Sequence, residues 1–258
     1  MSFDVARFEA DRAARGLSLG SPVSWLETTE STNDDALKAA KAGARHGALC
    51  GAETQSRGRG RRGSEWHSEP GAGLWFSVLL RPQLTAEVAP ALSLCAGLAV
   101  REAVASRSAA QVAVKWPNDV LAGGRKIAGI LIESQVIGQQ LRGVVVGIGL
   151  NVEQRAFPSE LVGVATSLAL LEARDRAREP LLVDVLAGLE ARVARLEAAG
   201  VSSISEEVRQ HDALLGKRLR IDEREGIGAG IDDTGHLLLR TDAGLVEAIS
   251  SGHVQLLG

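Results

Sequence analysis

The stretch Lys-Trp-Pro-Asn-Asp at residues 115–119 follows an alternating apolar run at 112–114. The run predicts a strand that ends here, because proline has no N–H for a sheet ladder and holds the residue before it extended. Asn118 and Asp119 then favour a turn. Lys115 is therefore expected at a strand end on a stiff segment, where ligands of α/β sheets bind.

A second segment, residues 55–63, reads Gln-Ser-Arg-Gly-Arg-Gly-Arg-Arg-Gly and is closely followed by Trp66. Glycines let the backbone approach a ligand, and arginines this close repel one another unless an anion lies among them. A solvated loop and an RNA-binding segment are the alternatives. The run occurs once and lies between two apolar strands, which argues against both.

Composition limits the class of protein. A chain of 258 residues with 45% hydrophobic residues suggests one large domain, or a large and a small one, with a substantial core. The net charge of −3 does not indicate a globally nucleic-acid-binding protein. The two cysteines lie in apolar contexts and are expected to be buried thiols, and the five histidines show no metal-binding spacing.

Nothing in the sequence indicates a membrane protein. No segment reaches the roughly 18 apolar residues of a membrane span. The N-terminus carries several charged residues and no apolar signal-peptide core. We therefore expect a cytoplasmic protein.

Residues 1–22 are expected to form one short helix that docks through Val5, Phe8 and Leu17. A second helix should begin with Thr32 or Asn33 as its cap. It should stop at Gly43. Further strands are expected at 48–53, 74–80, 112–116, 126–136 and 142–148, with a turn at 138–140, and further helices at 85–106, 180–199 and 203–214.

From about residue 216 the pattern changes to short, closely spaced strands. They are expected at 218–222, 226–231, 236–241, 246–249 and 254–257, which predicts a small β-barrel. The expected domains are an N-terminal extension (1–22), a catalytic domain (23–214) and a C-terminal domain (215–258).

The two motifs are followed by Lys-Ile-Ala-Gly-Ile-Leu-Ile-Glu at 126–133 and Gly-Ile-Gly-Leu-Asn-Val at 147–152. In this order the segments resemble those of the biotin–protein ligases, which attach biotin to carboxylase carrier proteins. The resemblance runs from about Val23 to the C-terminus. It implies an α+β fold of the class II synthetase type, with a mixed, largely antiparallel sheet, packed helices and an SH3-like C-terminal domain.

The resemblance also implies roles for individual residues. Lys115 would bridge the biotin carboxylate and the α-phosphate of ATP, offsetting their repulsion, and Arg61 would be the second catalytic residue. The implied biotin-binding residues are Ser31, Thr32, Asn33, Gln55, Gly58, Arg59, Gly60, Arg61, Lys115, Gly129 and Ile130. The implied ATP-binding residues are Arg61, Arg62, Trp66, Lys115, Asn118 and Asn151.

Within these sets the expected contacts differ. Ser31, Thr32 and Asn33 would hydrogen-bond the ureido ring of biotin, beside Gln55. Gly129 and Ile130 would form an apolar wall, and Asn151 would face adenine or ribose. Trp66 would steady the arginine loop or stack near adenine. Ser64 stands where family members often have an arginine. Lys126 would either bind phosphate or, as we expect, stay solvated in a hairpin. Asp119 and Glu133 are candidates to help place Mg²⁺, whose ligands the sequence does not identify.

The implied reaction forms biotinyl-AMP from biotin and MgATP and then biotinylates a lysine of a biotin carboxyl carrier protein. Family habit suggests a homodimer through the sheet edge near residues 136–146. About 22 residues precede the catalytic domain, too few for a DNA-binding module, so no operator binding is expected. The alternatives are a lipoate or octanoate ligase of the same fold and, remotely, an RNA-binding module. No P-loop motif occurs.

Overall fold

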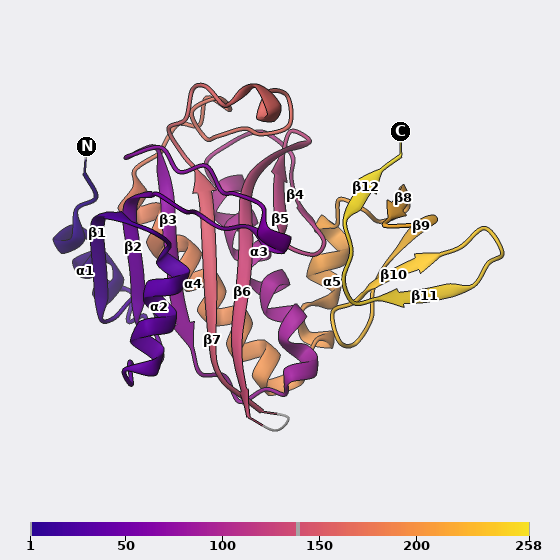
Figure 1. The fold of residues 1–258 in the computed structure, drawn as a ribbon, viewed down its shortest axis with the longest axis horizontal. Coiled ribbons are helices and arrows are strands. Elements are labelled where there is room, and N and C mark those ends of the chain that lie inside the picture. Colours follow the sequence, from indigo (N-terminus) through magenta and orange to yellow (C-terminus); the bar gives the residue numbers. More distant parts are fainter. Residues whose placement is uncertain (1, 138–139, 258) are drawn as a thin grey trace.

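The computed structural model of the chain describes residues 2–137 and 140–257, and within them it contains two β-sheets (Figure 1). The larger sheet has seven strands in the order β1-β2-β3-β7-β6-β5-β4, and only β1 and β2 pair in parallel. The smaller sheet is antiparallel, in the order β11-β10-β9-β8-β12. The expected α+β class with a C-terminal β-domain is confirmed.

The strands of the larger sheet are β1 (Val23–Thr29), β2 (Leu49–Gln55), β3 (Gly73–Leu80), β4 (Val112–Lys115), β5 (Asp119–Ala122), β6 (Arg125–Ile137) and β7 (Gln140–Asn151). Those of the smaller sheet are β8 (Arg218–Ile221), β9 (Arg224–Ile231), β10 (Leu237–Arg240), β11 (Val246–Ile249) and β12 (Val254–Leu256). The helices are α1 (Val5–Ala14), α2 (Thr32–Lys41), α3 (Ala89–Ala105), α4 (Arg178–Ala199) and α5 (Ser202–His211), with 3-10 turns η1 (Arg61–Gly63), η2 (Ala86–Val88) and η3 (Ser159–Leu161).

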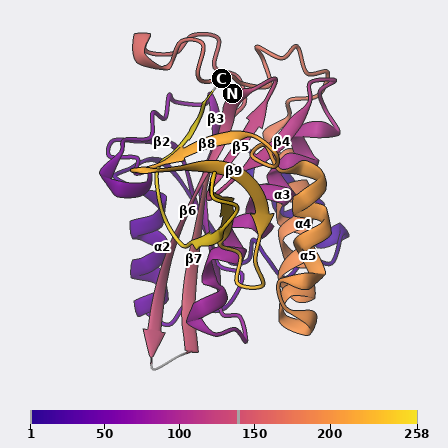
Figure 2. The same ribbon diagram turned by 90° about the vertical axis from the view of Figure 1, so that its right-hand side faces the viewer.

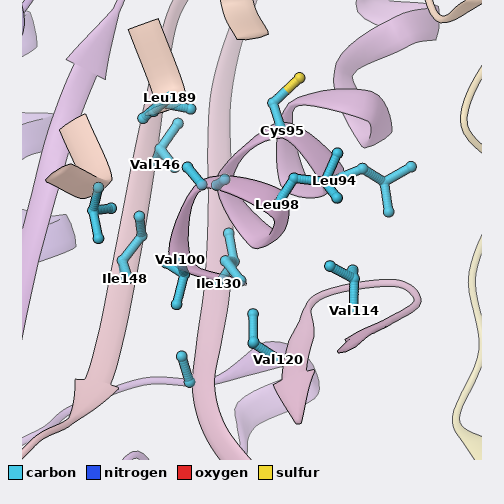
Figure 3. Close-up of a cluster of buried hydrophobic side chains, with 14 of the residues drawn as sticks. Leu94, Cys95, Leu98, Val100, Val114, Val120, Ile130, Val146, Ile148 and Leu189 are labelled. Atoms are coloured by element: carbon cyan, nitrogen blue, oxygen red, sulfur yellow. The ribbon is translucent and has the colours of Figure 1, made fainter. Parts of the chain in front are cut away.

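The helices divide between the two faces of the larger sheet. Helix α2 lies on one face, and α3, α4 and α5 lie on the other (Figure 2). Because side chains alternate along a strand, β7 sends Val144, Val146, Ile148 and Leu150 into the core beneath α3 and α4. Figure 3 shows Leu94, Leu98 and Val100 of α3 in one cluster with Ile130 and Ile148 of the sheet. The opposite face is left for the site.

Helix α3 is the central core helix. Together with η2, residues Ala86–Ala105 are long and apolar enough to cross a membrane by length and composition alone, which the sequence analysis did not anticipate. Most of this window is buried inside the protein, against the sheet and α4. Its hydropathy is therefore explained by the core it fills.

The ends of α2 differ partly from expectation. Ser31, rather than Thr32 or Asn33, occupies the cap position, and its side chain makes no capping bond. Thr32 and Asn33 lie within the first turn and are buried. Their polar groups therefore point into the protein and do not cap the helix. Gly43 adopts a φ of +90° directly after the cap residue Ala42, as expected for a helix stop.

Strand β5 was not predicted. Asn118 and Asp119 do turn the chain, but Asp119 already pairs with Lys115 as the first residue of an antiparallel neighbour. At the N-terminus, Phe8 is fully buried and Val5 and Leu17 pack against the core as expected. Part of the predicted turn at 138–140 lies outside the described residues, and the dimer near 136–146 stays a prediction.

The C-terminal domain contacts both the segment 115–119 and the arginine loop. The indole Nε1 of Trp116 donates to the carbonyl oxygen of Gly235 over 3.0 Å. Gly235 has a φ of +86°, and a Cβ there would lie 3.1 Å from the backbone nitrogen of Ala91. An ion pair of 3.3 Å joins Arg62 Nη1 to Asp222 Oδ1. The segment 115–119 is therefore fixed by the C-terminal domain as well as by its own hairpin.

The core predicts a measurable loss of stability on truncation. Leu98 is fully buried between the sheet and α4, so Leu98→Ala should lower the free energy of unfolding by about 2–5 kcal/mol. Urea unfolding followed by circular dichroism measures it. The control Leu245→Ala, at a side chain that is 66% exposed, should change the free energy of unfolding by less than about 0.5 kcal/mol. Equal effects of the two substitutions would contradict the assigned core.

Candidate active site

A cavity of about 510 Å³ opens on the α2 face of the larger sheet, a size typical of small-molecule sites. The N-terminus of α2, the arginine loop, the β4–β5 turn and strands β6 and β7 surround it. Of the residues implied for biotin and ATP, Gly58 and Asn151 are not in its lining. Those that line it are Ser31, Thr32, Asn33, Gln55, Arg59, Gly60, Arg61, Arg62, Trp66, Lys115, Asn118, Gly129 and Ile130.

Two cross-strand rows form the floor of the cavity. In the first row Ser77 of β3, Gly147 of β7 and Leu131 of β6 are register partners. A Cβ at Gly147 would overlap the side chain of Asn33, so the missing side chain lets Asn33 reach the sheet. In the second row Gly149 pairs with Gly129.

Trp66, which follows the arginine loop, packs over the second row. A Cβ at Gly149 would overlap the indole ring, and one at Gly129 would lie 2.8 Å from it. The edge of Trp75 lies below, with ring centroids 6.1 Å apart. Trp66 therefore steadies the loop against the sheet, which is one of the two roles expected for it.

One end of the cavity is polar and uncharged. Thr32 N–H donates to Gln55 Oε1 over 2.9 Å, and the Thr32 and Ser77 hydroxyls are 2.8 Å apart. Ser77 Oγ in turn donates to Asn33 Oδ1 over 2.6 Å. Thr32, Asn33 and Ser77 are almost completely buried, so these hydrogen bonds are sheltered from water.

The other end gathers cations. Burial lowers the pKa of Lys115, and the neighbouring Lys126 lowers it further while Asp119 opposes the shift. Burial and the nearby Arg62 likewise lower the pKa of Arg61, whose Nη1 lies 3.4 Å from Asn118 Oδ1. Positive charge held in a partly desolvated site is typical of a site for an anion.

Lys126 is less solvated than expected, with 33% of its side chain exposed. Its Nζ lies 2.7 Å from Asp119 Oδ1 and 5.3 Å from the ring centroid of Trp66, and it lines the cavity. The turn at 123–124 made a surface position plausible from sequence. The antiparallel pairing of β5 with β6, which brings Lys126 beside Asp119, was the missing information.

The arginines of the loop have different partners. Arg59 bridges Asp34 at 2.7 Å and Glu133 at 3.0 Å, and Arg62 pairs with Asp222. Arg61 has no carboxylate partner in the described part of the chain. Ser64 closes the turn by donating to the Arg61 carbonyl oxygen over 2.8 Å. The ion pairs of Arg59 and Arg62 anchor the loop on both sides of Arg61.

Three expectations need correction. The side chain of Ile130 packs in the core beneath α3 (Figure 3), because strand alternation places it opposite Gly129, so Ile130 borders the cavity through its backbone. Gly58 instead gives room to the Trp66 carbonyl oxygen. Both ends of the Asn151 amide are engaged inside the protein, with the Thr166 carbonyl oxygen at 3.0 Å and Gln154 Nε2 at 3.3 Å.

The candidates for Mg²⁺ are already engaged by protein groups. Asp119 pairs with Lys126, and Glu133 pairs with Arg59 and accepts from Asn33. Among residues 2–137 and 140–257, no group of three or more His, Cys, Asp or Glu side chains is placed to hold a metal ion. The residues present therefore do not build a metal site of their own.

Sequence reasoning missed the contribution of the C-terminal domain. Gly252, His253 and Val254 line the cavity, and the backbone N–H of His253 donates to Asp222 Oδ1 over 3.1 Å. Gly252 and His253 lie between the last two predicted strands, Val254 begins the last of them, and none belongs to a motif. Only the docking of the smaller sheet brings them to the site.

Comparisons with known proteins agree with this geometry. Residues 25–151 match the Biotin/lipoate A/B protein ligase family, and residues 218–257 match the Biotin protein ligase C terminal domain. The chain is 34% identical over 244 residues to the bifunctional ligase/repressor BirA of Bacillus spizizenii, covering 92% of this chain and 75% of that protein. It is 40% identical over 228 residues to the biotin–[acetyl-CoA-carboxylase] ligase of Paracoccus denitrificans, covering 85% and 94%.

Solved structures lead to the same family. The biotin protein ligase from Aquifex aeolicus in complex with biotin and ATP superposes with a TM-score of 0.77 at 28% identity, covering 92% of this chain and 99% of that chain. The Leishmania major biotin protein ligase in complex with biotinyl-5-AMP gives a TM-score of 0.61 at 29% identity, with 90% and 99% covered. In sequence, in both domains and in fold, this chain belongs to the biotin protein ligase family.

Proposed function

We propose that the cavity binds biotin and ATP together, forms biotinyl-AMP and presents it to a lysine of a biotin carboxyl carrier protein. The observation that carries the proposal is the polarity of the cavity. Hydrogen-bonding groups that carry no charge lie at one end of the cavity. Lys115, Arg61 and Lys126 lie at the other end, with Asp119 as a carboxylate among them. Biotin has the matching polarity, with a neutral ureido ring and a carboxylate.

At the uncharged end, Ser31, Thr32 and Gln55 would hold the ureido ring. Ser31 is 3% exposed, and no described residue hydrogen-bonds to its hydroxyl. The indole of Trp66, which packs over Gly129 and Gly149, would offer an apolar surface to the hydrocarbon part of the ligand. This arrangement supports a ring that both donates and accepts hydrogen bonds.

At the charged end, an oxygen of the biotin carboxylate would attack the α-phosphorus of ATP. The new P–O bond forms as the bond to the bridging oxygen breaks, and pyrophosphate leaves. Lys115 and Arg61 would offset the repulsion between the two anions and the charge that develops in the transition state. Mg²⁺ would supply further charge neutralisation to the triphosphate when bound, and no protein ligand is assigned to it.

In the second step the neutral amine of the carrier lysine would attack the carbonyl carbon of the mixed anhydride, and AMP would leave. The protein contributes positioning and protection from water. The arginine loop, anchored by Arg59 and Arg62, would cover the anhydride until the carrier arrives. The carrier as acceptor rests on this chemistry and on the names of the relatives.

Isothermal titration of the purified protein with biotin, with and without ATP, tests the proposal. Mass spectrometry of the same samples then detects biotinyl-AMP. Biotin binding and adenylate formation would support it. A competing titration with lipoate separates the two substrates of the matched family, because the ring of lipoate has no hydrogen-bond donors or acceptors for Thr32 and Gln55. Binding of lipoate in place of biotin would overturn the proposal.

The first prediction concerns Lys115. Replacing it by alanine should slow biotinyl-AMP formation by at least about 10²–10³-fold, because a charge facing the reacting anions is lost. Pyrophosphate release under saturating biotin and ATP measures the rate, and thermal unfolding checks that the fold survives. Lys41→Ala removes an exposed lysine at the end of α2 and should leave the rate unchanged. Wild-type turnover of Lys115→Ala would remove Lys115 from the mechanism.

The second prediction concerns retention of the intermediate. The Arg61→Gly variant should release biotinyl-AMP faster, because it loses the loop arginine that hydrogen-bonds to Asn118. The released biotinyl-AMP should then label amines of a bystander protein. Arg57→Gly is the matched control in the same loop, since Arg57 is largely exposed and pairs only at the surface with Glu30. Bystander labelling by a streptavidin blot should rise with the first substitution alone. No rise with Arg61→Gly would refute the role.

The third prediction follows from the lowered pKa of Lys115. The reaction needs the protonated amine, so the rate of adenylate formation should fall as pH rises through that pKa. Because burial lowers the value from 10.5, the fall should begin at a lower pH than for an ordinary lysine. A pH profile of kcat/KM, which reports the free enzyme, measures it, with thermal unfolding at each pH. A rate that holds constant up to the ordinary lysine pKa would contradict the assignment.

A further inference from the structure

Resting on the function proposed above, we propose that Glu133 is a positioning residue that sets the hydrogen-bond polarity of the ureido end through Asn33 and Ser77. Glu133 does not line the cavity. It accepts from Asn33 Nδ2 over 2.7 Å and pairs with Arg59 at 3.0 Å. We call the chain from Glu133 through Asn33 and Ser77 to Thr32 the relay.

The direction of the relay follows from groups that cannot change their role. Asn33 Nδ2 faces the Glu133 carboxylate and, at 3.4 Å, the carbonyl oxygen of Leu131, and both groups only accept. The carbonyl oxygen of the Asn33 amide must therefore point the other way, toward Ser77. The Ser77 hydroxyl hydrogen is used there, in the bond of 2.6 Å.

The hydroxyl of Thr32 is fixed in consequence. With its own hydrogen on Asn33, Ser77 Oγ presents a lone pair to Thr32 Oγ1 at 2.8 Å. The other neighbour of that hydroxyl, Gln55 Oε1 at 3.2 Å, also accepts, because the Thr32 backbone N–H donates to it. The single hydrogen of Thr32 therefore stays inside the protein, and Thr32 offers a ligand only a lone pair.

The same bonds orient Gln55. Its Oε1 is held by the Thr32 N–H, so its Nε2 points away as a donor, and no described residue accepts from it. The cavity thus presents an acceptor beside a donor. The matching ligand carries an N–H next to a carbonyl, as a cyclic urea does. A ring without such groups would leave both protein groups unpaired, which is strongly unfavourable in a buried site.

Without Glu133 the relay loses its direction. Only the Leu131 carbonyl oxygen, at 3.4 Å, would still accept from Asn33 Nδ2, so the amide would be free to turn over and donate to Ser77 Oγ. The Ser77 hydrogen would then face Thr32 Oγ1, and the Thr32 hydrogen would lose its acceptor at 2.8 Å. Its remaining acceptor inside the protein, Gln55 Oε1 at 3.2 Å, already accepts from the Thr32 backbone N–H, so the hydroxyl hydrogen would turn toward the cavity and oppose the ureido N–H. Glu133 therefore acts on the ligand through Thr32, while its ion pair with Arg59 is a separate contact.

A double-mutant cycle on biotin affinity tests the relay, with titration calorimetry in the absence of ATP. Thr32→Val should weaken biotin binding by about tenfold or more, the size of one buried hydrogen bond, and Glu133→Leu should also weaken it. In the Thr32→Val background, Glu133→Leu should have almost no further effect. Ser77→Ala replaces Glu133→Leu in the cycle if the latter does not fold, as judged by thermal unfolding.

Two further variants separate the relay from the ion pair. Glu133→Gln keeps an acceptor for Asn33 Nδ2 but removes the charge beside Arg59, and it should retain wild-type affinity. Asp34→Asn weakens the other carboxylate contact of Arg59 without touching Asn33. It should leave the affinity unchanged.

The outcomes distinguish the two proposals. Additive losses in the cycle, unchanged affinity in Thr32→Val, or a loss in Glu133→Gln as large as in Glu133→Leu would each overturn the relay while biotin binding by the wild type stands. A wild-type protein that does not bind biotin would overturn the proposed function first, and the relay with it.

Discussion

The site depends on a strip of backbone that carries no side chains. Gly147 and Gly149 face α2 on β7, and Gly129 continues the strip on β6. Any Cβ there would collide with Asn33 or Trp66. The sheet can therefore support polar and aromatic groups from elsewhere in the chain directly against its backbone. On the other face the same strands carry valine, isoleucine and leucine, and those side chains build the core. The alternation of side chains along β6 and β7 thus produces both the packed core on one face of the sheet and the cavity on the other.

Electrostatics divide the cavity in a way that matches the chemistry. The end of the cavity proposed for the ureido ring uses neutral hydroxyl and amide groups. The acceptors behind these groups determine which of them donate a hydrogen bond to the ligand and which accept one. At the other end burial lowers the pKa of Lys115 and that of Arg61. The neighbouring Lys126 lowers the pKa of Lys115 further, the neighbouring Arg62 lowers that of Arg61 further, and Asp119 opposes both shifts. That crowding is unfavourable in the protein alone and is relieved by an anion. The site is therefore arranged for a ligand that is neutral at one end and negative at the other.

Much of this was predictable from the sequence, for definite reasons. The strand at 112–114 and its stop at Pro117 follow from local chemistry, and so do the hairpins of the C-terminal sheet. The arginine-glycine run could be assigned to a ligand loop because it cannot be core. Strand alternation should also have separated Ile130 from Gly129. The partners of Lys126, the role of Ser77 and the wall at Gly252–Val254 depend on which strands lie side by side, and no local pattern determines that.

The hydrogen bond from Trp116 to Gly235 has a consequence for how such enzymes diversify. The tryptophan of the lysine motif belongs to the larger domain, but its indole N–H donates to a turn of the smaller one. That turn also favours glycine, because Gly235 has a φ of +86° and a Cβ there would lie 3.1 Å from the backbone nitrogen of Ala91. A C-terminal domain taken from a distant relative would have to bring both the carbonyl group and the bare backbone to the same place. The two domains are therefore constrained to change together at this contact.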